Sequence, residues 1–510
     1  QLGTLNEIGL LAGAPETIAW GFEANENPPK LKTHDRFGKR IDEIGFHSSW
    51  HRLLKNATRF GLHASPWQSP RAGAHVARAA GFFLWAQVEA GHGCPISMTY
   101  SAVPALQTQP KLAAIWEPKL AARSYDPQLA PVTEKASALC GMAMTEKQGG
   151  SDVRANQSRA TFDQSSSEGE IYRITGHKWF CSAPMSDAFL TLAQTDAGLT
   201  CFFMPRVLPD GTRNVFLIQR LKDKLGNRSN ASCEVEFEDT YALLVGEPGR
   251  GVQTIVEMVN YTRLDCINGS AALMRQAVAQ AIHHCTYRHA FGKALRAQPL
   301  MQNVLADLAL ESEAATLLLM RLSGAADRAP TDPHEAALKR LGTAVGKYWV
   351  CKRAPGVVNE ALESLGGNGY VEESIMPRLY RESPLNSIWE GSGNINALDV
   401  LRILAKQPDA VEAFFSEITP AQDDPLIAAA TLRLQTEMRD VADQQPRARR
   451  IVEQMALLWQ AALLRQHAPM ATSDAFSRSR LDGEWGHALG TLPNGIALRA
   501  IVDRAAPEAG

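Results

Sequence analysis

Residues 141–152 read GMAMTEKQGGSD, and this stretch separates two kinds of sequence. Before it, apolar residues recur at helical spacing, as in 47–54 and 73–90. After it come short β-branched and aromatic runs separated by turns. We therefore expect a helical domain over residues 1–137 and an antiparallel β-domain over residues 138–240. The expected strands are 171–175, 188–192, 199–203, 215–218 and 233–237, with a hairpin tip over 163–169.

Helical patterns return after the β-domain. Stretches 269–287, 299–322 and 334–365 are amphipathic and predict a helical bundle domain over residues 241–404. Past Pro408 and Pro420, stretches 426–441 and 450–465 predict an extra C-terminal helical domain over residues 405–510. The order of helices, sheet and helices predicts an α+β fold that is mainly α, unlike the alternating order of a Rossmann enzyme.

Composition excludes several classes of protein. The chain has 510 residues, enough for three or four domains at roughly 100–200 residues each, and a formal net charge of −2. Its eight cysteines include no CxxC pair, which argues against a zinc ribbon and is typical of reduced thiols in cytoplasmic protein cores. No stretch approaches ~18 consecutive apolar residues, so we expect no membrane span and a cytoplasmic location.

Several catalytic motifs are missing from the sequence. No G-x-G-x-x-G follows an expected strand, and H-E-x-x-H and G-x-S-x-G do not occur. The nearest approach to a P-loop is 342–347 (GTAVGK), which is one residue short and lies in a helical pattern. The sequence therefore indicates neither a classical nicotinamide site, nor a P-loop, nor a zinc hydrolase.

Three motifs have both a structural and a functional interpretation. The stretch 141–152 is a glycine turn, or a site whose amides and hydroxyls bind a flat ligand with polar edges. The stretch 177–182 (HKWFCS) is an ordinary strand with core aromatics, or a wall for a planar cofactor. In 381–395 (RESPLNSIWEGSGNI), Glu390 is a helix-start carboxylate, or a base in an apolar pocket that removes a weakly acidic C–H proton.

Six motifs in this order resemble the acyl-CoA dehydrogenase superfamily over residues 85 to 404. They are T-E-x-x-G-G-S-D (145–152), K-W-x-x-S (178–182), K-L-G-x-R (224–228), R-x-x-F-G (288–292), L-G-G-x-G-Y (365–370) and W-E-G-S-G-N (389–394). Segments 35–51, 222–237 and 386–394, with the helical tail past 405, further resemble the AidB-type branch, which is linked to the DNA alkylation response. The resemblance implies the acyl-CoA dehydrogenase fold, with FAD held between domains and subunits of a homotetramer that is a dimer of dimers.

The resemblance also implies roles for particular residues. Glu390 is the expected catalytic base, which removes the α-proton of an acyl-CoA thioester while the β-hydride passes to flavin N5. Other members carry their catalytic glutamate on an earlier helix, beside an arginine. In this sequence that place is occupied by Tyr261, Thr262 and Arg263, which include no carboxylate. Arg263 and Trp389 are expected on the substrate side. The residues expected to bind FAD are Met142, Thr145, Gly150, Ser151, Trp179, Phe180, Ser182, Arg288, Phe291, Gln298, Gly366, Gly367, Ser392 and Asn394.

The sequence departs from the superfamily pattern at three places. Glu363 replaces a usual glutamine, and the glutamine expected at Pro299 falls at Gln298, so subunit-bridging FAD contacts are expected to differ. Trp389 stands where many relatives carry tyrosine, which predicts a narrowed or reshaped acyl pocket.

The AidB-type branch further implies duplex DNA binding by the helical tail. Residues 405–510 contain 11 Lys+Arg and 14 Asp+Glu, a net charge of −3, which opposes that expectation. The candidate DNA contacts are Arg433, Arg439, Arg447, Arg449 and Arg450.

Three functions remain open from the sequence. The favoured one is an AidB-like flavoprotein of the alkylation response, with weak acyl-CoA dehydrogenase activity. The alternatives are a metabolic short- or branched-chain acyl-CoA dehydrogenase, similar to the isovaleryl-CoA enzyme and without a DNA role, and a flavin-stabilised assembly without turnover. The sequence names neither the substrate nor the electron acceptor.

Overall fold

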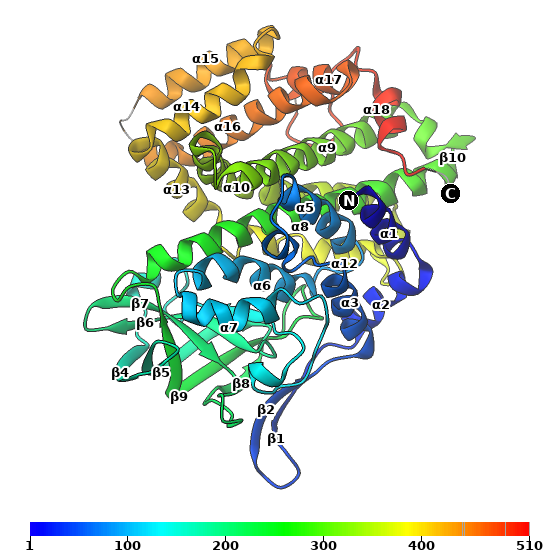
Figure 1. The fold of residues 1–510 in the computed structure, drawn as a ribbon. Helices are drawn as coiled ribbons and strands as arrows, with labels where there is room; N and C mark the ends of the chain where they lie inside the picture. Colours follow the sequence, from blue (N-terminus) through cyan, green and yellow to red (C-terminus); the bar gives the residue numbers. More distant parts are fainter. Residues whose placement is uncertain (441, 443, 485, 509–510) are drawn as a thin grey trace. The chain divides into compact units, whose positions relative to one another are not determined.

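The computed structural model describes residues 1–440, 442, 444–484 and 486–508. Its backbone divides into two compact units, a first unit of residues 1–262 and a second unit of residues 263–510. The division falls inside one long helix, α8 (Gly251–Tyr287) (Figure 1). Among the helices of the described residues, none combines the length and apolar character needed to cross a bilayer.

The first unit begins with helices interrupted by a β-hairpin. The hairpin joins β1 (Lys30–His34) to β2 (Arg40–Gly45) and projects from the rest of the unit (Figure 1). Asp35 closes its turn, because one carboxylate oxygen accepts from the amides of Phe37 and Lys39 at 2.8 and 2.9 Å. Only helices were expected in this part of the chain, and the hairpin departs from that expectation. The helices are α1 (Leu2–Ala12), α2 (Pro15–Glu26), α3 (Ser48–Arg59), α4 (Ser65–Gln68), α5 (Ala74–Ala86), α6 (Gly93–Leu106) and α7 (Pro110–Leu120).

A seven-stranded sheet follows in the same unit. Its strands are β3 (Cys140–Ala143), β4 (Arg159–Ser165), β5 (Glu170–Ser182), β6 (Ala188–Thr195), β7 (Gly198–Pro205), β8 (Leu217–Leu221) and β9 (Ser232–Val245). The order is β3-β6-β4-β5-β9-β7, with β8 on β9, and β7 also pairs with β6, so the sheet closes on itself. Its interior is apolar and includes Phe189, Phe202, Phe216 and Phe237.

The five expected strands and the β4–β5 hairpin are confirmed, although the strand expected at 215–218 is shifted to β8. The sheet is not purely antiparallel, because β3 runs parallel to β6 in the register Cys140–Ala188 to Ala143–Thr191. Strand β3 is only four residues long and overlaps the start of the 141–152 stretch, for which the sequence predicts a turn or a ligand site. Short parallel strands carry little period-2 signal, which explains why it was not predicted.

The second unit is a helical bundle that continues from α8. A short hairpin follows α8, formed by β10 (His289–Ala290) and β11 (Lys293–Ala294). The helices are α9 (Pro299–Arg328), α10 (Pro333–Ser364), α11 (Gly367–Tyr370), α12 (Met376–Glu382), α13 (Gly393–Lys406), α14 (Pro408–Ile418), α15 (Pro425–Arg439), α16 (Gln444–His467), α17 (Met470–Arg480) and α18 (Leu498–Ala505). The long helices expected in 241–404 and 405–510 are confirmed. The predicted end of one of them, Val441, lies outside the described residues.

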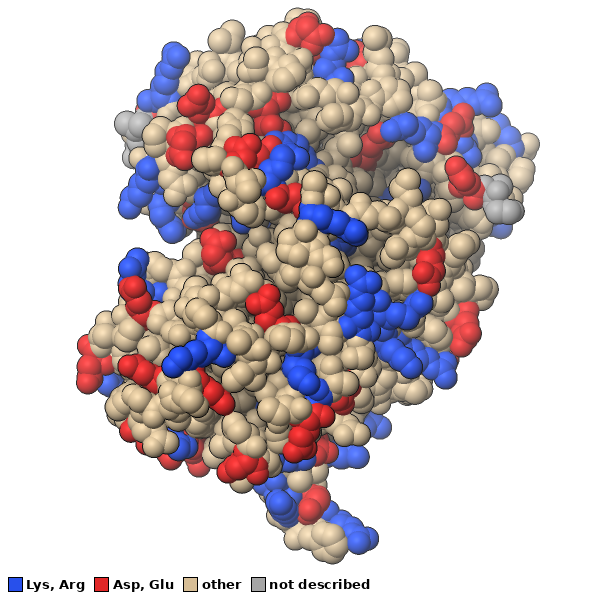
Figure 2. Space-filling view, viewed as in Figure 1, with Lys and Arg blue, Asp and Glu red and all other residues tan. Residues whose placement is uncertain are grey.

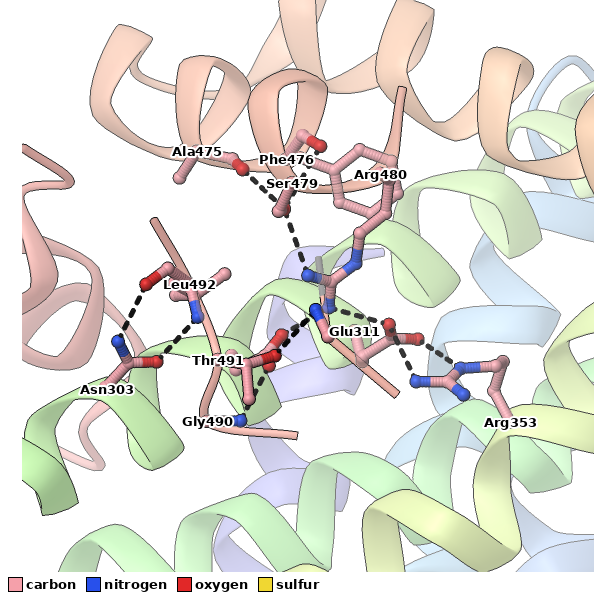
Figure 3. Close-up of polar contacts among 12 residues, drawn as sticks. Asn303, Glu311, Arg353, Ala475, Phe476, Ser479, Arg480, Gly490, Thr491 and Leu492 are labelled. Atoms are coloured by element: carbon pink, nitrogen blue, oxygen red, sulfur yellow. Dashed lines mark hydrogen bonds and ion pairs between the residues drawn. The ribbon is translucent and has the colours of Figure 1, made fainter. Parts of the chain in front are cut away.

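Buried charged groups attach α17 and the segment after it to α9 (Figure 3). Arg480 of α17 is fully buried and pairs with Asp307 and with Glu311 of α9, the latter at 2.9 Å. Arg353 of α10 binds the same Glu311 at 3.1 Å. The amide of Gly490 donates to Asp307 at 2.8 Å. Each buried carboxylate has a cation beside it. The attraction between them offsets the free-energy cost of removing these charges from water.

The pairing of Glu311 predicts an acid-sensitive contribution to stability. Burial alone would raise the pKa of this carboxyl, but Arg353 and Arg480 outweigh it and lower the pKa from 4.5 to about 2. A carboxyl whose pKa is depressed in the folded state stabilises the fold above its unfolded pKa and loses that effect as pH falls toward the folded value. We expect Glu311→Gln to lower the free energy of unfolding by about 3 kcal/mol at pH 7. That difference should shrink between pH 4.5 and about 2.

Urea unfolding of the wild type and the variant at pH 7, 4 and 2.5 measures this difference. Glu412→Gln is the matched control, because Glu412 is an exposed carboxylate on α14. A difference for Glu311→Gln that stays constant with pH would contradict the prediction.

Candidate functional site

In the first unit, the loop after β3 lies against strand β5. The carbonyl of Thr145 accepts a hydrogen bond from the amide of Trp179 at 2.8 Å. Two residues further along the loop, the Lys147 amide contacts Nε2 of His177 at 3.1 Å. The structure therefore brings the first two motifs together, with Thr145 beside Trp179.

A buried ion pair lies beneath this junction. Lys178 Nζ contacts Glu146 Oε1 at 2.8 Å, and neither side chain is exposed. Glu146 also accepts from the amide of Gln157 at 2.6 Å, and Lys178 donates to the carbonyl of Leu192 at 2.7 Å. Burial alone would raise the pKa of Glu146, but Lys178 outweighs it and holds that pKa below its usual value. Since successive side chains of a strand point to opposite faces, anchoring Lys178 inside turns Trp179 outward.

The residues around Thr145 and Trp179 form a partly exposed surface. Met142, Thr145, Trp179 and Ser182 are half-buried, whereas Gly150, Ser151 and Phe180 are exposed. Phe180 is 51% exposed, which is unusual for a large aromatic residue on a strand of a closed sheet. Lys222 Nζ lies 3.6 Å from the centre of the Trp179 ring, so a cation borders the same surface.

This surface fits a flat ligand with polar edges, such as a flavin ring. A Cβ at Gly150 would lie 2.4 Å from Thr145 Oγ1, so only glycine leaves that hydroxyl in its place. The hydroxyl of Ser182 is 3.1 Å from that of Ser232 on the neighbouring strand. Hydroxyls, backbone amides and exposed aromatic rings are the groups needed to bind the edge and the face of such a ring.

Three of the residues expected to bind FAD lie around the β10–β11 hairpin in the second unit. Phe291 and Gly292 form its two-residue turn, and both have positive φ, 52° and 83°, as in a type I′ turn. Phe291 is 96% exposed, and Arg288 is also exposed. Gln298 precedes α9 and donates from Nε2 to the carbonyl of Ala290 at 2.9 Å. Gln298 therefore supports the hairpin from inside the same chain.

Gly366 and Gly367 lie at the turn between α10 and α11. Both are exposed, and a Cβ at either would meet nothing within 4 Å. Gly366 has φ +60° and ψ −142°, a conformation open essentially to glycine alone. Glu363, which replaces the usual glutamine, is exposed in the last turn of α10.

Glu390 has a left-handed backbone, with φ at +57°, and it precedes Gly391, with φ at +94°. A non-glycine residue in this conformation is strained by about 1–3 kcal/mol and persists only where its surroundings impose it. Arg263 Nε donates to the Glu390 carbonyl at 3.0 Å, and Lys347 Nζ donates to the carbonyls of Trp389 and Gly391. Donors from α8 and α10 therefore impose the strained turn.

The neighbours of Glu390 are fixed as well. The Trp389 indole donates to Asn386 Oδ1 at 2.9 Å. Asn396 Nδ2 donates to the carbonyls of Gly391 and Ser392 at 2.7 and 3.0 Å. Ser392 precedes α13, and its hydroxyl makes no capping bond to that helix.

Arg263 lies beneath the Glu390 loop. It is buried and contacts Asp399 at 2.7 Å, and Asp399 also contacts Arg340 at 2.7 Å. Together these two arginines hold the pKa of Asp399 below its usual value, although burial alone would raise it. The geometry therefore gives Arg263 a supporting position under Glu390. Its expected place on the substrate side stays a prediction.

The five candidate DNA-contacting arginines differ in their surroundings. Arg447 pairs with Glu437 at 2.7 Å and Asp440 at 3.2 Å. Arg433 donates to the carbonyl of Leu481 at 2.6 Å, and Arg449 Nε donates to Asn394 Oδ1 at 2.8 Å. Arg439 and Arg450 are exposed, and Arg450 lies 4.0 Å from Glu437. On the face drawn in Figure 2, positive and negative side chains intermingle over α14 and α15, with no continuous basic surface there.

The sequence motifs contained supporting residues whose roles were not predicted. Glu146 and Lys178 stand in the motifs T-E and K-W, but only their neighbours were expected to act. Lys347 ends the stretch GTAVGK on α10, where Ala344 and Cys351 on the same helix face are fully buried. A lysine on the core face of a helix is the signal that could have identified it.

Three protein families match successive parts of the chain. The family described as adaptive response protein AidB N-terminal domain matches residues 1–127. The acyl-CoA dehydrogenase middle domain matches residues 141–240, and the acyl-CoA dehydrogenase C-terminal domain matches residues 249–405. The AidB protein of Escherichia coli (strain K12) is 47% identical over 502 residues, covering 97% of this chain and 91% of that protein.

The chain belongs to the acyl-CoA dehydrogenase family, in its AidB-type branch.

The chain is also similar to other proteins of the acyl-CoA dehydrogenase family, in sequence or in structure. Acyl-CoA dehydrogenase family member 11 of Caenorhabditis elegans is 30% identical, over 88% of this chain and 77% of that protein. The crystal structure of Caenorhabditis elegans ACDH-11 in complex with C11-CoA has a TM-score of 0.82 at 26% identity, covering 96% and 88% of the two chains. A Bacillus anthracis acyl-CoA dehydrogenase complexed with FAD has a TM-score of 0.70 at 19% identity over 91% and 87% of the two chains, and shares the fold.

The Glu146–Lys178 pair predicts a large effect of a single substitution. Lys178→Met leaves a buried carboxylate without its cation, so we expect the free energy of unfolding to fall by about 3–5 kcal/mol. The double variant Glu146→Gln/Lys178→Met removes both charges and should recover most of that loss. Urea unfolding followed by circular dichroism measures both.

Arg173→Met is the control, because Arg173 and Asp163 form a half-exposed pair at 2.8 Å, and loss of such a pair costs less than about 1 kcal/mol. A Lys178→Met protein as stable as the wild type would show that the pair does not anchor the loop.

Proposed function

We propose that this chain is an FAD-dependent acyl-CoA dehydrogenase of the AidB type, with Glu390 as the base that removes the α-proton of an acyl thioester. The observation that carries the proposal is the strained, left-handed backbone of Glu390, which donors from two helices impose. Strain of this kind clusters at active sites, because a fold retains it where geometry matters for chemistry. The C11-CoA complex of the Caenorhabditis elegans relative supports an acyl-CoA ligand.

The residues proposed to hold FAD are those whose positions fit the cofactor. In the first unit, Thr145 and Ser182 offer hydroxyls, and Trp179 and Phe180 offer aromatic surface. Bound FAD would supply the acceptor for the β-hydride. Glu390 would take the α-proton onto its carboxylate, and a dry site would strengthen the hydrogen bonds that hold the thioester oxygen.

Trp389 bears on the choice of substrate. Its bond to Asn386 fixes the indole next to Glu390. A bulky side chain held there supports a preference for short or branched acyl chains. Turnover of medium-chain acyl-CoA at a comparable rate would count against this part of the proposal.

A homotetramer, arranged as a dimer of dimers, is the proposed assembly. Large apolar side chains of the second unit are exposed, including Phe291, Leu300 at 84% and Tyr370 at 82%. Exposed apolar side chains of this size are typical of surfaces that another chain covers.

The base is tested by an anaerobic flavin titration. A panel of short, branched and medium acyl-CoAs is added to the purified protein, and bleaching of the oxidised flavin band is followed. One member of the panel should bleach the band of the wild type. Glu390→Gln should slow the bleaching about 10²- to 10⁴-fold, the usual contribution of a general base, and should still bind flavin.

Glu372→Gln is the matched control, because Glu372 is an exposed carboxylate that contacts Arg381 at the surface. Bleaching of Glu390→Gln at the wild-type rate would eliminate Glu390 as the base. A bound flavin that no acyl-CoA reduces would instead favour a protective role without acyl-CoA turnover.

Duplex DNA binding by residues 405–510 is a second proposal, supported by the exposure of Arg439, Arg449 and Arg450. The pairing of Arg447 with Glu437 and Asp440 and the net charge of −3 oppose it.

If these arginines contact phosphates, the affinity for a duplex should fall steeply with salt, and each removed arginine should lower the salt slope by about 1. Fluorescence anisotropy of a labelled duplex across a salt series, with the wild type and Arg439→Gln, measures both. No binding at low salt would reject the proposal.

A further inference from the structure

Lys347 is a buried cation whose partners are backbone carbonyls. It lies in the middle of α10 and is 1% exposed. Its Nζ donates to the carbonyl of Trp389 at 2.8 Å and to the carbonyl of Gly391. Lysine is rarely buried so completely, because taking an ammonium group out of water is unfavourable unless strong hydrogen bonds compensate it.

The two carbonyls that Lys347 binds stand on either side of Glu390. The peptide group before Glu390 carries the Trp389 carbonyl, which Lys347 binds, and the peptide group after it carries the carbonyl of Glu390 itself, which Arg263 binds. Lys347 also binds the carbonyl of Gly391, one peptide group further along the chain. An ammonium has three donor hydrogens, so it can bridge two carbonyls where a single-donor group could hold only one. The bridge therefore spans the strained residue itself.

The other two donors act on single sides of the turn. Arg263 holds the carbonyl of Glu390 at 3.0 Å, and Asn396 holds those of Gly391 and Ser392. Lys347 is the donor that the structure shows on the Trp389 carbonyl. Loss of the Lys347 ammonium group would therefore free the backbone immediately before Glu390.

We propose that Lys347 is a positioning residue for the reaction, which fixes the direction of the Glu390 carboxylate by bridging the carbonyls on both sides of it. This inference rests on the proposed function of Glu390 as the base. Lys347 itself contacts neither substrate nor reacting atoms in this role. A displacement of about 1 Å at a reacting group is enough to slow a reaction about 10²-fold.

The test uses Lys347→Met in the full-length flavoprotein. Methionine keeps an unbranched stem and removes the ammonium, so the Trp389 carbonyl loses its donor. We expect kcat for the acyl-CoA that reduces the wild-type flavin to fall about 10²-fold, with KM changed less than about twofold. Hydrogen exchange at the amides of residues 388–393 should accelerate about tenfold or more, with exchange elsewhere in α10 and α13 unchanged.

Lys135→Met is the matched control. Lys135 is also 1% exposed at its side chain, and it also donates to backbone carbonyls, among them that of Asp126 at 3.0 Å, but in the first unit and with Asp187 beside it at 3.1 Å. This variant should lose stability and retain its kcat. If Lys347→Met does not fold, Lys347→Gln, which keeps a shorter donor, replaces it and should give a smaller loss of kcat and a smaller rise in exchange.

Two results would overturn the inference about Lys347. One is unchanged kcat together with unchanged exchange at 388–393. The other is faster exchange throughout the second unit with kcat and KM altered together, which would make Lys347 a purely structural residue. A fully active Glu390→Gln protein would overturn the proposed function instead, and the exchange at 388–393 would still show whether Lys347 holds the loop.

Discussion

The fully buried ion pair between Glu146 and Lys178 sets the position of the loop after β3 against strand β5. Each partner also binds backbone, Glu146 through the amide of Gln157 and Lys178 through the carbonyl of Leu192. Two segments distant in sequence are thereby locked in one register. A one-residue slip of β5 would turn Trp179 into the sheet and bring Lys178 to the surface. The strong penalty for unpairing a buried charge makes such a slip unfavourable.

In the second unit, too, buried charged side chains bind the backbone of a loop, but through different residues. Around Glu390 the buried cations are Arg263 and Lys347, and they act on carbonyl oxygens. Arg263 is neutralised by Asp399, which Arg340 binds as well. In both units, buried charged side chains fix the backbone conformation of a short loop. Each loop carries a residue with an expected role, Thr145 in binding FAD and Glu390 as the base. A site built on such supports is rigid without being part of a helix or strand.

From the sequence alone, parts of the candidate site were ambiguous, because the same residue type can pack in a core or bind a ligand. The sequence allows two interpretations of Trp179 and Phe180, an ordinary strand with core aromatics or a wall for a planar cofactor, and Phe180 is exposed. The hairpin of β1 and β2 was not expected, because its short strands are separated only by an Asx-type turn at Asp35, in a region dominated by helical spacing. The sequence did not predict that the Arg263 guanidinium contacts a carbonyl and a carboxylate of its own chain, because both partners lie more than a hundred residues away in sequence.

The sequence by itself determined the order of helices, sheet and helices, the positions of the long helices, and the motifs that place the chain in its family. Those properties follow from local periodicity and from short residue patterns, which are present in the chain before it folds. Only the tertiary structure decided which atoms the buried charged residues bind, that Glu390 has a strained backbone, and that Arg447 is paired while Arg439 is exposed. These properties depend on contacts between residues far apart in sequence, such as Lys347 with Trp389, and no local pattern encodes such distances.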